Sequence, residues 1–216
     1  MAAPPPKTAP KPGRVKVYRA LYDYAARSDQ EMSFSEGDLL YVSDKGPNDD
    51  WLPAICLGRK GLVPANYVIS ENVEELPNPL HEAAKRGNIE FLKECIANQV
   101  SINSLDKSGS TALYWACHGG HEEIVDCLLQ YPNITVSSQN KMGDTPLHAA
   151  SWKGHRGVVE RLLNKNANVW VKNQDKKTPY DVAKDADVAA LLSQTMKSDT
   201  TNEQAAQEYL SDSDND

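Results

Sequence analysis

Ala20-Leu21-Tyr22-Asp23-Tyr24 opens the stretch of sequence that decides the fold of the N-terminal part of this chain. The motif is followed, in chain order, by Asp29, Glu31, Asp49-Asp50-Trp51 and Pro64-Ala65-Asn66-Tyr67. Short alternating runs such as Val15–Ala20 and Asp38–Val42 surround these residues, and turn-forming residues separate the runs. We therefore predict a small all-β barrel over residues 14–70.

A barrel core alone does not explain the aromatic residues of this stretch. Trp51 directly follows two aspartates in a predicted turn, where an indole is difficult to bury. Exposed rings form flat apolar walls, and a polyproline II segment presents ridges that fit between them at little cost in entropy. The pattern indicates a site for an extended proline-rich peptide. Core positions are instead expected at Ala20, Leu39, Val42, Ala54, Val63 and Val68.

In this combination and order, the motifs resemble the SH3 family over nearly the whole segment. The resemblance implies peptide-binding slots lined by Tyr22, Tyr24, Trp51, Pro64, Asn66 and Tyr67. It also implies an acidic pocket for a ligand Arg or Lys, formed by Asp29, Glu31, Asp49 and Asp50. A charge-assisted hydrogen bond in this pocket fixes the orientation of the peptide. Whether Glu31 or the Asp49-Asp50 pair sets that orientation stays open at this point.

A repeated motif begins at Pro79. Pro79-Leu80-His81-Glu82-Ala83 returns in related form at 112–116, 146–150 and 179–183, and its final alanine recurs at intervals of 33, 34 and 33 residues. The period and motif resemble the ankyrin repeat, a β-turn followed by two antiparallel helices. We expect a short linker over 71–78, then repeats over 72–105, 106–139 and 140–172, and a degenerate cap over 173–195.

The two ends of the chain are polar and rich in residues that do not build a core. Residues 1–13 contain repeated prolines, and residues 196–216 end in Ser-Asp-Ser-Asp-Asn-Asp, so both are expected to be disordered. Ser211 and Ser213 each have an acid three residues further on, which suits an acid-directed kinase. A tail that only improves solubility is the alternative.

In the repeats, residues that depart from the repeat pattern are the candidates for partner contact. We single out Trp115, Lys141, Met142 and Trp152, although packing between repeats is an equal alternative for Trp152 and the favoured one for Trp115. The motif histidines His81 and His148 are expected to hydrogen-bond the backbone of neighbouring turns. Cys117, His118 and His121 lack a second Cys/His pair, so no zinc site is predicted.

Composition excludes several classes of function. The net charge of −7 argues against nucleic-acid binding, which needs a basic face. No apolar run approaches the roughly 20 residues of a membrane span, and the four cysteines show no CxxC pairing. No nucleophile, paired-carboxylate, metal or phosphate-loop motif is present, so we predict no enzyme and no cofactor. A cytoplasmic monomer is expected.

The sequence thus predicts a multidomain chain, a small all-β SH3-like barrel followed by an all-α ankyrin-repeat solenoid. This combination resembles the osteoclast-stimulating factors, a family of small intracellular adaptors. The resemblance implies a signalling role that promotes osteoclast formation and bone resorption indirectly. Proline-rich signalling or cytoskeletal proteins are the expected partners of the barrel, and an unknown protein is the expected partner of the repeats. The alternative is a regulatory subunit whose repeats inhibit or position an enzyme.

Overall fold

The computed structural model describes residues 15–43, 50–69 and 71–212, without the side chains of residue 69 and residues 200–212. The predicted proline-rich arm, Asp49 and Ser213 lie outside this part of the chain. The chain divides into two compact units, whose main division falls between Pro77 and Asn78. Each unit is described below by itself.

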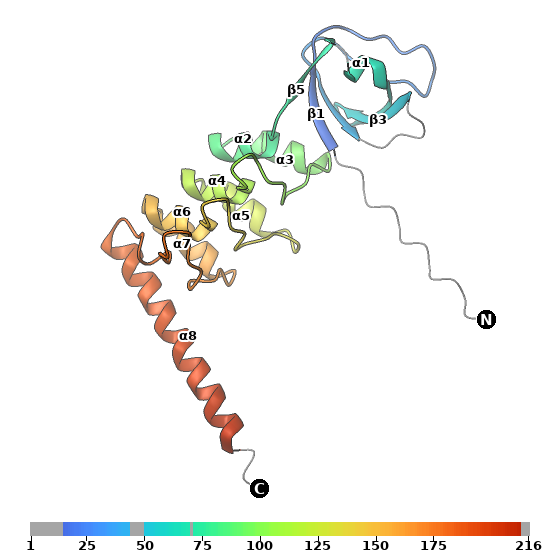
Figure 1. Ribbon diagram of the computed structural model, residues 1–216. Helices are drawn as coiled ribbons and strands as arrows, with labels where there is room; N and C mark the ends of the chain where they lie inside the picture. Colours follow the sequence, from blue (N-terminus) through green and yellow to red (C-terminus); the bar gives the residue numbers. More distant parts are fainter. Residues whose placement is uncertain (1–14, 44–49, 70, 213–216) are drawn as a thin grey trace, which may run out of the picture. The chain divides into compact units, whose positions relative to one another are not determined.

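The first unit is a five-stranded antiparallel sheet with the strand order β4-β3-β2-β1-β5. Its strands are short, as a small barrel requires, and a one-turn helix follows the fourth (Figure 1). The elements are β1 (Val15–Ala20), β2 (Leu39–Ser43), β3 (Trp51–Cys56), β4 (Arg59–Pro64), α1 (Ala65–Ile69) and β5 (Val73–Leu76). Among the described residues the predicted barrel is therefore all-β apart from α1.

One apolar core lies inside this sheet, and it contains most of the predicted core residues. Ala20, Val42, Ala54, Val63 and Val68 are all buried, as is Cys56. The prediction is wrong at Leu39, which is half-buried, whereas Leu40 is completely buried. Side chains alternate between the two faces of a strand, so two adjacent leucines leave the register open to a shift of one residue.

The predicted linker 71–78 is corrected by the structure. Its central residues form strand β5, which pairs with β1 so that Val17 lies opposite Leu76 and Ala20 opposite Val73. Val73 also packs against the barrel core. The first unit therefore extends past residue 70, and the first repeat begins at Pro79 rather than at 72. Two exposed glutamates separate the apolar ends of this strand, which is why it resembles a polar connection in the sequence.

The second unit stacks helix pairs of nearly constant length (Figure 1). The first helices of successive repeats contact one another, α2 against α4 and α4 against α6, and the second helices α5 and α7 do the same. The elements are α2 (Pro79–Arg86), α3 (Ile89–Ala97), α4 (Ala112–Gly119), α5 (Glu122–Leu129), α6 (Pro146–Lys153) and α7 (Arg156–Leu163). Small alanines at the repeat interval are buried between the first helices and allow their close packing.

Local chemistry sets the ends of these helices. Thr111 and Thr145 are N-caps whose hydroxyl oxygens accept hydrogen bonds from the backbone N–H three residues further on. Gly120 and Gly154 end α4 and α6 at φ of 73° and 77°, in the left-handed region that favours glycine. These residues explain why the first helices begin and end at equivalent positions of successive repeats.

The two motif histidines bond the backbone as predicted. Nε2 of His81 lies 3.0 Å from the carbonyl oxygens of Ser104 and Ser110. Nε2 of His148 lies 3.0 Å from the carbonyl oxygen of Lys177. Because a carbonyl oxygen only accepts, each imidazole donates its Nε2–H to the turn of the next repeat.

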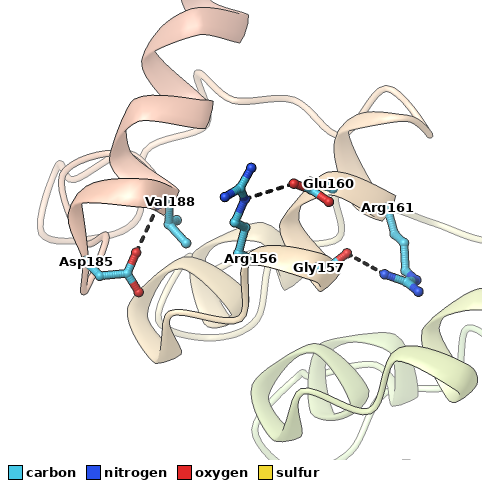
Figure 2. Close-up of polar contacts among 6 residues, drawn as sticks. All are labelled: Arg156, Gly157, Glu160, Arg161, Asp185 and Val188. Carbon is cyan, nitrogen blue, oxygen red and sulfur yellow. Dashed lines mark hydrogen bonds and ion pairs between the residues drawn. The ribbon is translucent and has the colours of Figure 1, made fainter.

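Among the described residues, the degenerate repeat at the C-terminal end has only its second helix. Residues 179–182 form turns in place of a first helix, and α8 (Ala186–Asp212) follows. Asp185 begins this helix, because its Oδ1 accepts a hydrogen bond of 3.0 Å from the backbone N–H of Val188 (Figure 2). The expectation of disorder from residue 196 differs from the structure, in which α8 continues to Asp212. The run 186–212 contains no Gly or Pro and is rich in helix-forming residues.

Candidate functional site

Loops and strand ends of the first unit enclose an open groove of about 970 Å³. Its walls combine aromatic rings with carboxylates and a single guanidinium. The lining residues are Tyr24, Arg27, Glu31, Asp50, Trp51, Pro64, Ala65, Asn66, Tyr67 and Asn72. Most of the residues predicted to bind a peptide are thus gathered around one groove, although they come from distant parts of the chain.

The aromatic wall is rigid because its rings pack on a buried phenylalanine. Tyr24 stacks on Phe34 with ring centroids 5.3 Å apart, and Tyr67 meets Phe34 edge-on at 5.2 Å. The hydroxyl of Tyr67 also donates a hydrogen bond of 2.7 Å to the carbonyl oxygen of Tyr22. Burial raises the pKa of both Tyr24 and Tyr67, so their hydroxyls stay protonated at neutral pH. Each hydroxyl proton is already donated within the protein, by Tyr67 to Tyr22 and by Tyr24 to Glu31, so the fixed phenols offer a peptide their ring faces and acceptor lone pairs at little cost in entropy.

Glu31 closes the loop that forms one end of the groove. Its Oε2 accepts hydrogen bonds from the Tyr24 hydroxyl at 2.9 Å and from the Arg27 backbone N–H at 2.8 Å. Its Oε1 accepts one from the Ser28 hydroxyl at 3.2 Å. The backbone hydrogen bond from Arg27 is the main reason that the pKa of Glu31 lies below its usual value. The carboxylate is therefore ionised, held in place and still able to accept a further bond, because two oxygens offer about four acceptor sites.

Trp51 is the first residue of β3 and pairs with Pro64 at the end of β4. The carbonyl oxygen of Asp50 accepts a hydrogen bond of 2.8 Å from the backbone N–H of Ala65. This bond ties the start of β3 to the start of α1. It brings the indole, the exposed Asn66 and the Asp50 carboxylate to the same groove.

The groove differs from the prediction at both margins. Tyr22 is 61% exposed and Asp29 lies in an exposed turn, and neither side chain lines the groove. Arg27 and Asn72 line it although the sequence analysis did not select them. Arg27 had a usable signal, since it lies in the acidic loop close to Glu31. Asn72 had none, because it reaches the groove only through the pairing of β5.

The candidates in the repeats fall into two separate places. Trp115 on α4 and Trp152 on α6 both contact the ring of His118, with centroid distances of 5.6 and 5.9 Å. We call Trp115, His118 and Trp152 the repeat aromatic cluster. Lys141 and Met142 instead lie in the turn before α6, and Met142 is 65% exposed.

The two tryptophans of the cluster have different surroundings. Trp115 is half-buried, and its Nε1–H donates a hydrogen bond of 2.7 Å to Oδ2 of Asp106, which fixes the ring. Trp152 is 57% exposed, and among the described residues its ring meets the Lys153 ammonium and the tilted ring of His118. The hydrogen bond to Asp106 agrees with a packing role for Trp115, whereas Trp152 is mostly exposed, and partner contact at Trp152 stays a prediction.

Within the described residues, no group of three His, Cys, Asp or Glu side chains is placed to hold a metal ion. Cys117 is buried, and burial raises the pKa of its thiol, which opposes the thiolate that zinc requires. In the same part of the chain, no helix combines the length and apolarity of a membrane span. Ser211 lies in the last turn of α8, and its side chain is not described.

Comparison with known proteins identifies both units and their combination. The family model described as a variant SH3 domain matches residues 20–69, and the model described as ankyrin repeats matches residues 80–173 with three copies. The chain is 54% identical to osteoclast-stimulating factor 1 of Danio rerio and 53% identical to that of Bos taurus, over 100% of each chain. It is 57% identical to the Gallus gallus protein over 89% of this chain and 94% of the relative. With an SH3 domain followed by ankyrin repeats and this full-length similarity, the chain belongs to the osteoclast-stimulating factor 1 family.

Proposed function

We propose that this chain is a non-catalytic cytoplasmic adaptor that binds a proline-rich segment of one protein and a second protein through its repeats. The observation that carries the proposal is the groove in which Tyr24, Trp51 and Tyr67 stand beside the carboxylates of Glu31 and Asp50. Aromatic walls suit the ridges of a polyproline II helix, and the carboxylates suit an Arg or Lys next to it.

The repeats add a second surface to the same chain. Binding at both places raises the effective concentration of one partner near the other without any new contact. By extension from the name of its relatives, we propose that such bridging acts in signalling that stimulates osteoclasts and thereby bone resorption. The partners of the groove are proline-rich signalling or cytoskeletal proteins.

The surroundings of Glu31 and Asp50 also suggest which of the two carboxylates binds the Arg or Lys of the peptide. Glu31 already accepts three hydrogen bonds from its own loop, so replacing it also loosens the groove wall. Asp50 is exposed directly before β3 and takes no part in these three hydrogen bonds of Glu31, so we expect its neutral variant to leave the Glu31 loop intact. We therefore assign the orientation of the peptide to Asp50 and the shape of the groove to Glu31.

The test is a titration of the full chain with a labelled PxxP peptide that contains one arginine, followed by fluorescence anisotropy. We expect micromolar affinity, about −8 kcal/mol. Trp51→Lys should weaken binding about 30-fold or more, because a central indole is lost. Trp170→Lys, which changes an indole that is 47% exposed in the repeats, is the matched control and should leave the affinity unchanged.

Two further results sharpen the assignment. Asp50→Asn should weaken the arginine peptide about threefold to tenfold and leave an alanine-substituted peptide unaffected, because only the charge pair is lost. Equal loss with both peptides contradicts the role of Asp50. Absence of binding by the unaltered chain contradicts the proposed use of the groove as a whole.

A further inference from the structure

The repeat aromatic cluster is flanked by lysines. Lys85 Nζ lies 5.0 Å from the centre of the Trp115 ring, and Lys153 Nζ lies 4.3 Å from that of Trp152. Lys184 joins Trp152 and Lys153 around a hollow of about 300 Å³. The three lysines come from α2 of the first repeat, α6 of the third repeat and the turns before α8, and the second repeat between them supplies Trp115 and His118 on α4.

The lysines create a local excess of positive charge on an acidic protein. Among the described residues, the ion pairs involve other basic side chains, and none includes Lys85, Lys153 or Lys184. The pKa of His118 is lowered chiefly by burial and further by Lys153, His155 and Lys85, which shows that the cluster lies in a positive field. The chain as a whole has a net charge of −7, so its composition alone does not produce this field.

The repeat fold does not require an exposed indole at this position. Close packing of the first helices depends on buried alanines such as Ala116 and Ala150. Trp152 lies outside that packing with more than half of its surface exposed. Tryptophan is enriched at the centres of protein interfaces, and charged groups lie mainly around the rim.

The arrangement of the lysines also distinguishes between anionic ligands. Single-stranded nucleic acid binds to aromatic platforms by stacking bases on free ring faces. In this cluster, Lys85 and Lys153 lie over the ring faces of Trp115 and Trp152. Their ammonium groups are held in place by cation–π contacts, and carboxylates reach such fixed cations without displacing them.

We propose that the repeat aromatic cluster docks an acidic segment of a partner protein. Its carboxylates meet Lys85, Lys153 and Lys184, and an apolar side chain of the segment packs on Trp152 in the hollow. This inference rests on the proposed function, in which the repeats hold the second protein, and adds the chemistry of that protein.

The test is a selection of random displayed peptides on the full-length chain carrying Trp51→Lys, which removes binding in the SH3 groove. Enriched peptides should be strongly acidic and should contain at least one large apolar residue. Their affinities are then measured by fluorescence anisotropy with a synthetic copy of each peptide. We expect about a 30-fold loss for Trp152→Ala and about a tenfold loss for Lys153→Gln with Lys184→Gln. The affinity should also fall as NaCl is raised, because the contacts are charge pairs near solvent.

The matched control combines Trp170→Ala with Lys165→Gln, an exposed indole and an exposed lysine elsewhere in the same unit. It should leave the acidic peptides bound. Enrichment of neutral or basic peptides, no enrichment, or equal loss in the control overturns the proposal. Tighter binding of a single-stranded RNA oligonucleotide to this face overturns it as well.

The two proposals fail separately. Acidic peptides that bind the cluster while proline peptides do not bind the unaltered chain remove the adaptor role of the groove and leave this surface standing. The reverse result removes this surface alone.

Discussion

The SH3 groove and the repeat aromatic cluster are both built from aromatic side chains, but the chain assembles them in opposite ways. Tyr24, Trp51 and Tyr67 come from a loop, a strand and a short helix, and only long-range pairing of the barrel brings them together. His118 and Trp152 come from first helices of adjacent repeats and are 34 residues apart, which is one repeat. The groove therefore depends on one non-local core, whereas the cluster depends on contacts between neighbouring repeats only.

The largest effect that tests this comparison is expected from the core of the middle repeat. Leu113 is completely buried on α4, between α2 and α6, so Leu113→Ala leaves a cavity where two repeat interfaces meet. We expect it to lower the free energy of unfolding by about 3 kcal/mol, measured by urea denaturation with circular dichroism at 222 nm. Leu105→Ala, at a leucine that is 51% exposed, is the control and should cost less than about 0.5 kcal/mol. Equal costs for the two variants contradict the packing described for the repeats.

The pH dependence of stability should differ between the two units, because all five histidines lie in the repeats. Burial lowers the pKa of His81 and of His148. Nδ1 of His81 is buried and has no hydrogen-bond partner within the described residues, so a proton placed there finds no acceptor. Nδ1 of His148 accepts the backbone N–H of Thr145 at 3.2 Å, so protonation breaks the cap of α6.

The sign of the effect follows from these contacts. Both histidines bind protons more weakly in the folded chain than in the unfolded chain, where the pKa of a histidine is about 6.5. Their contribution to stability is thus present above pH 6.5 and is lost as the pH falls toward the folded pKa. The limiting slope is about 1.4 kcal/mol per pH unit for each group.

Hydrogen exchange detected by mass spectrometry measures both units in one sample. After correction for the intrinsic exchange rate, protection of α2–α7 should decrease between pH 7 and pH 5. Protection of β1–β4 should persist until the pH falls far enough to protonate carboxylates. The pKa of Glu31 is lowered in the folded chain, so the stability that its ionised form contributes is lost only at that lower pH. A parallel loss in both units between pH 7 and pH 5 contradicts the role given to the histidines.

The same contrast explains what the sequence predicted and what it did not. The repeat period predicted the helix pairs α2–α7 and the backbone hydrogen bonds of His81 and His148, because these depend on local residues and on the adjacent repeat. The same period places His118 and Trp152 at equivalent positions of adjacent repeats, where their rings meet. Of the two residues, only Trp152 was singled out from the sequence. Strand β5 forms by pairing with β1, which is far away in the chain, and this pairing also places Asn72 in the groove. No local sequence pattern predicts it.

The groove residues were predicted from the order of their motifs and not from their surroundings. Tyr22 and Asp29 fit the motif equally well, yet both are exposed and neither lines the groove. Glu31 was expected to face the ligand, and its hydrogen bonds with the loop became visible only in three dimensions. Identity of a residue type therefore predicts membership of the site better than it predicts the role within it.

The smallest expected effect distinguishes contacts between repeats from contacts within one helix. Arg161 on α7 pairs with Glu122 at 3.0 Å and with Asp126 at 2.9 Å, both on α5 of the preceding repeat. It also donates a hydrogen bond of 2.8 Å to the carbonyl oxygen of Gly157 (Figure 2). Within the part of the chain that the structure describes, Arg156 pairs with Glu160 alone, four residues further along the same helix, at 2.9 Å.

Arg161→Gln should therefore cost about 1 kcal/mol of stability, because one guanidinium is held by two carboxylates across a repeat interface and by a carbonyl of its own helix. Arg156→Gln should cost about 0.3–0.5 kcal/mol, the usual value for an exposed pair on one helix. Urea denaturation at low and high NaCl measures both, and added salt should reduce the difference because all the carboxylates are about half exposed. A larger cost at Arg156 than at Arg161 means that the second helices, α5 and α7, are stabilised by contacts within each helix and not by contacts between repeats. In that case the dependence on neighbouring repeats rests on the buried first helices alone.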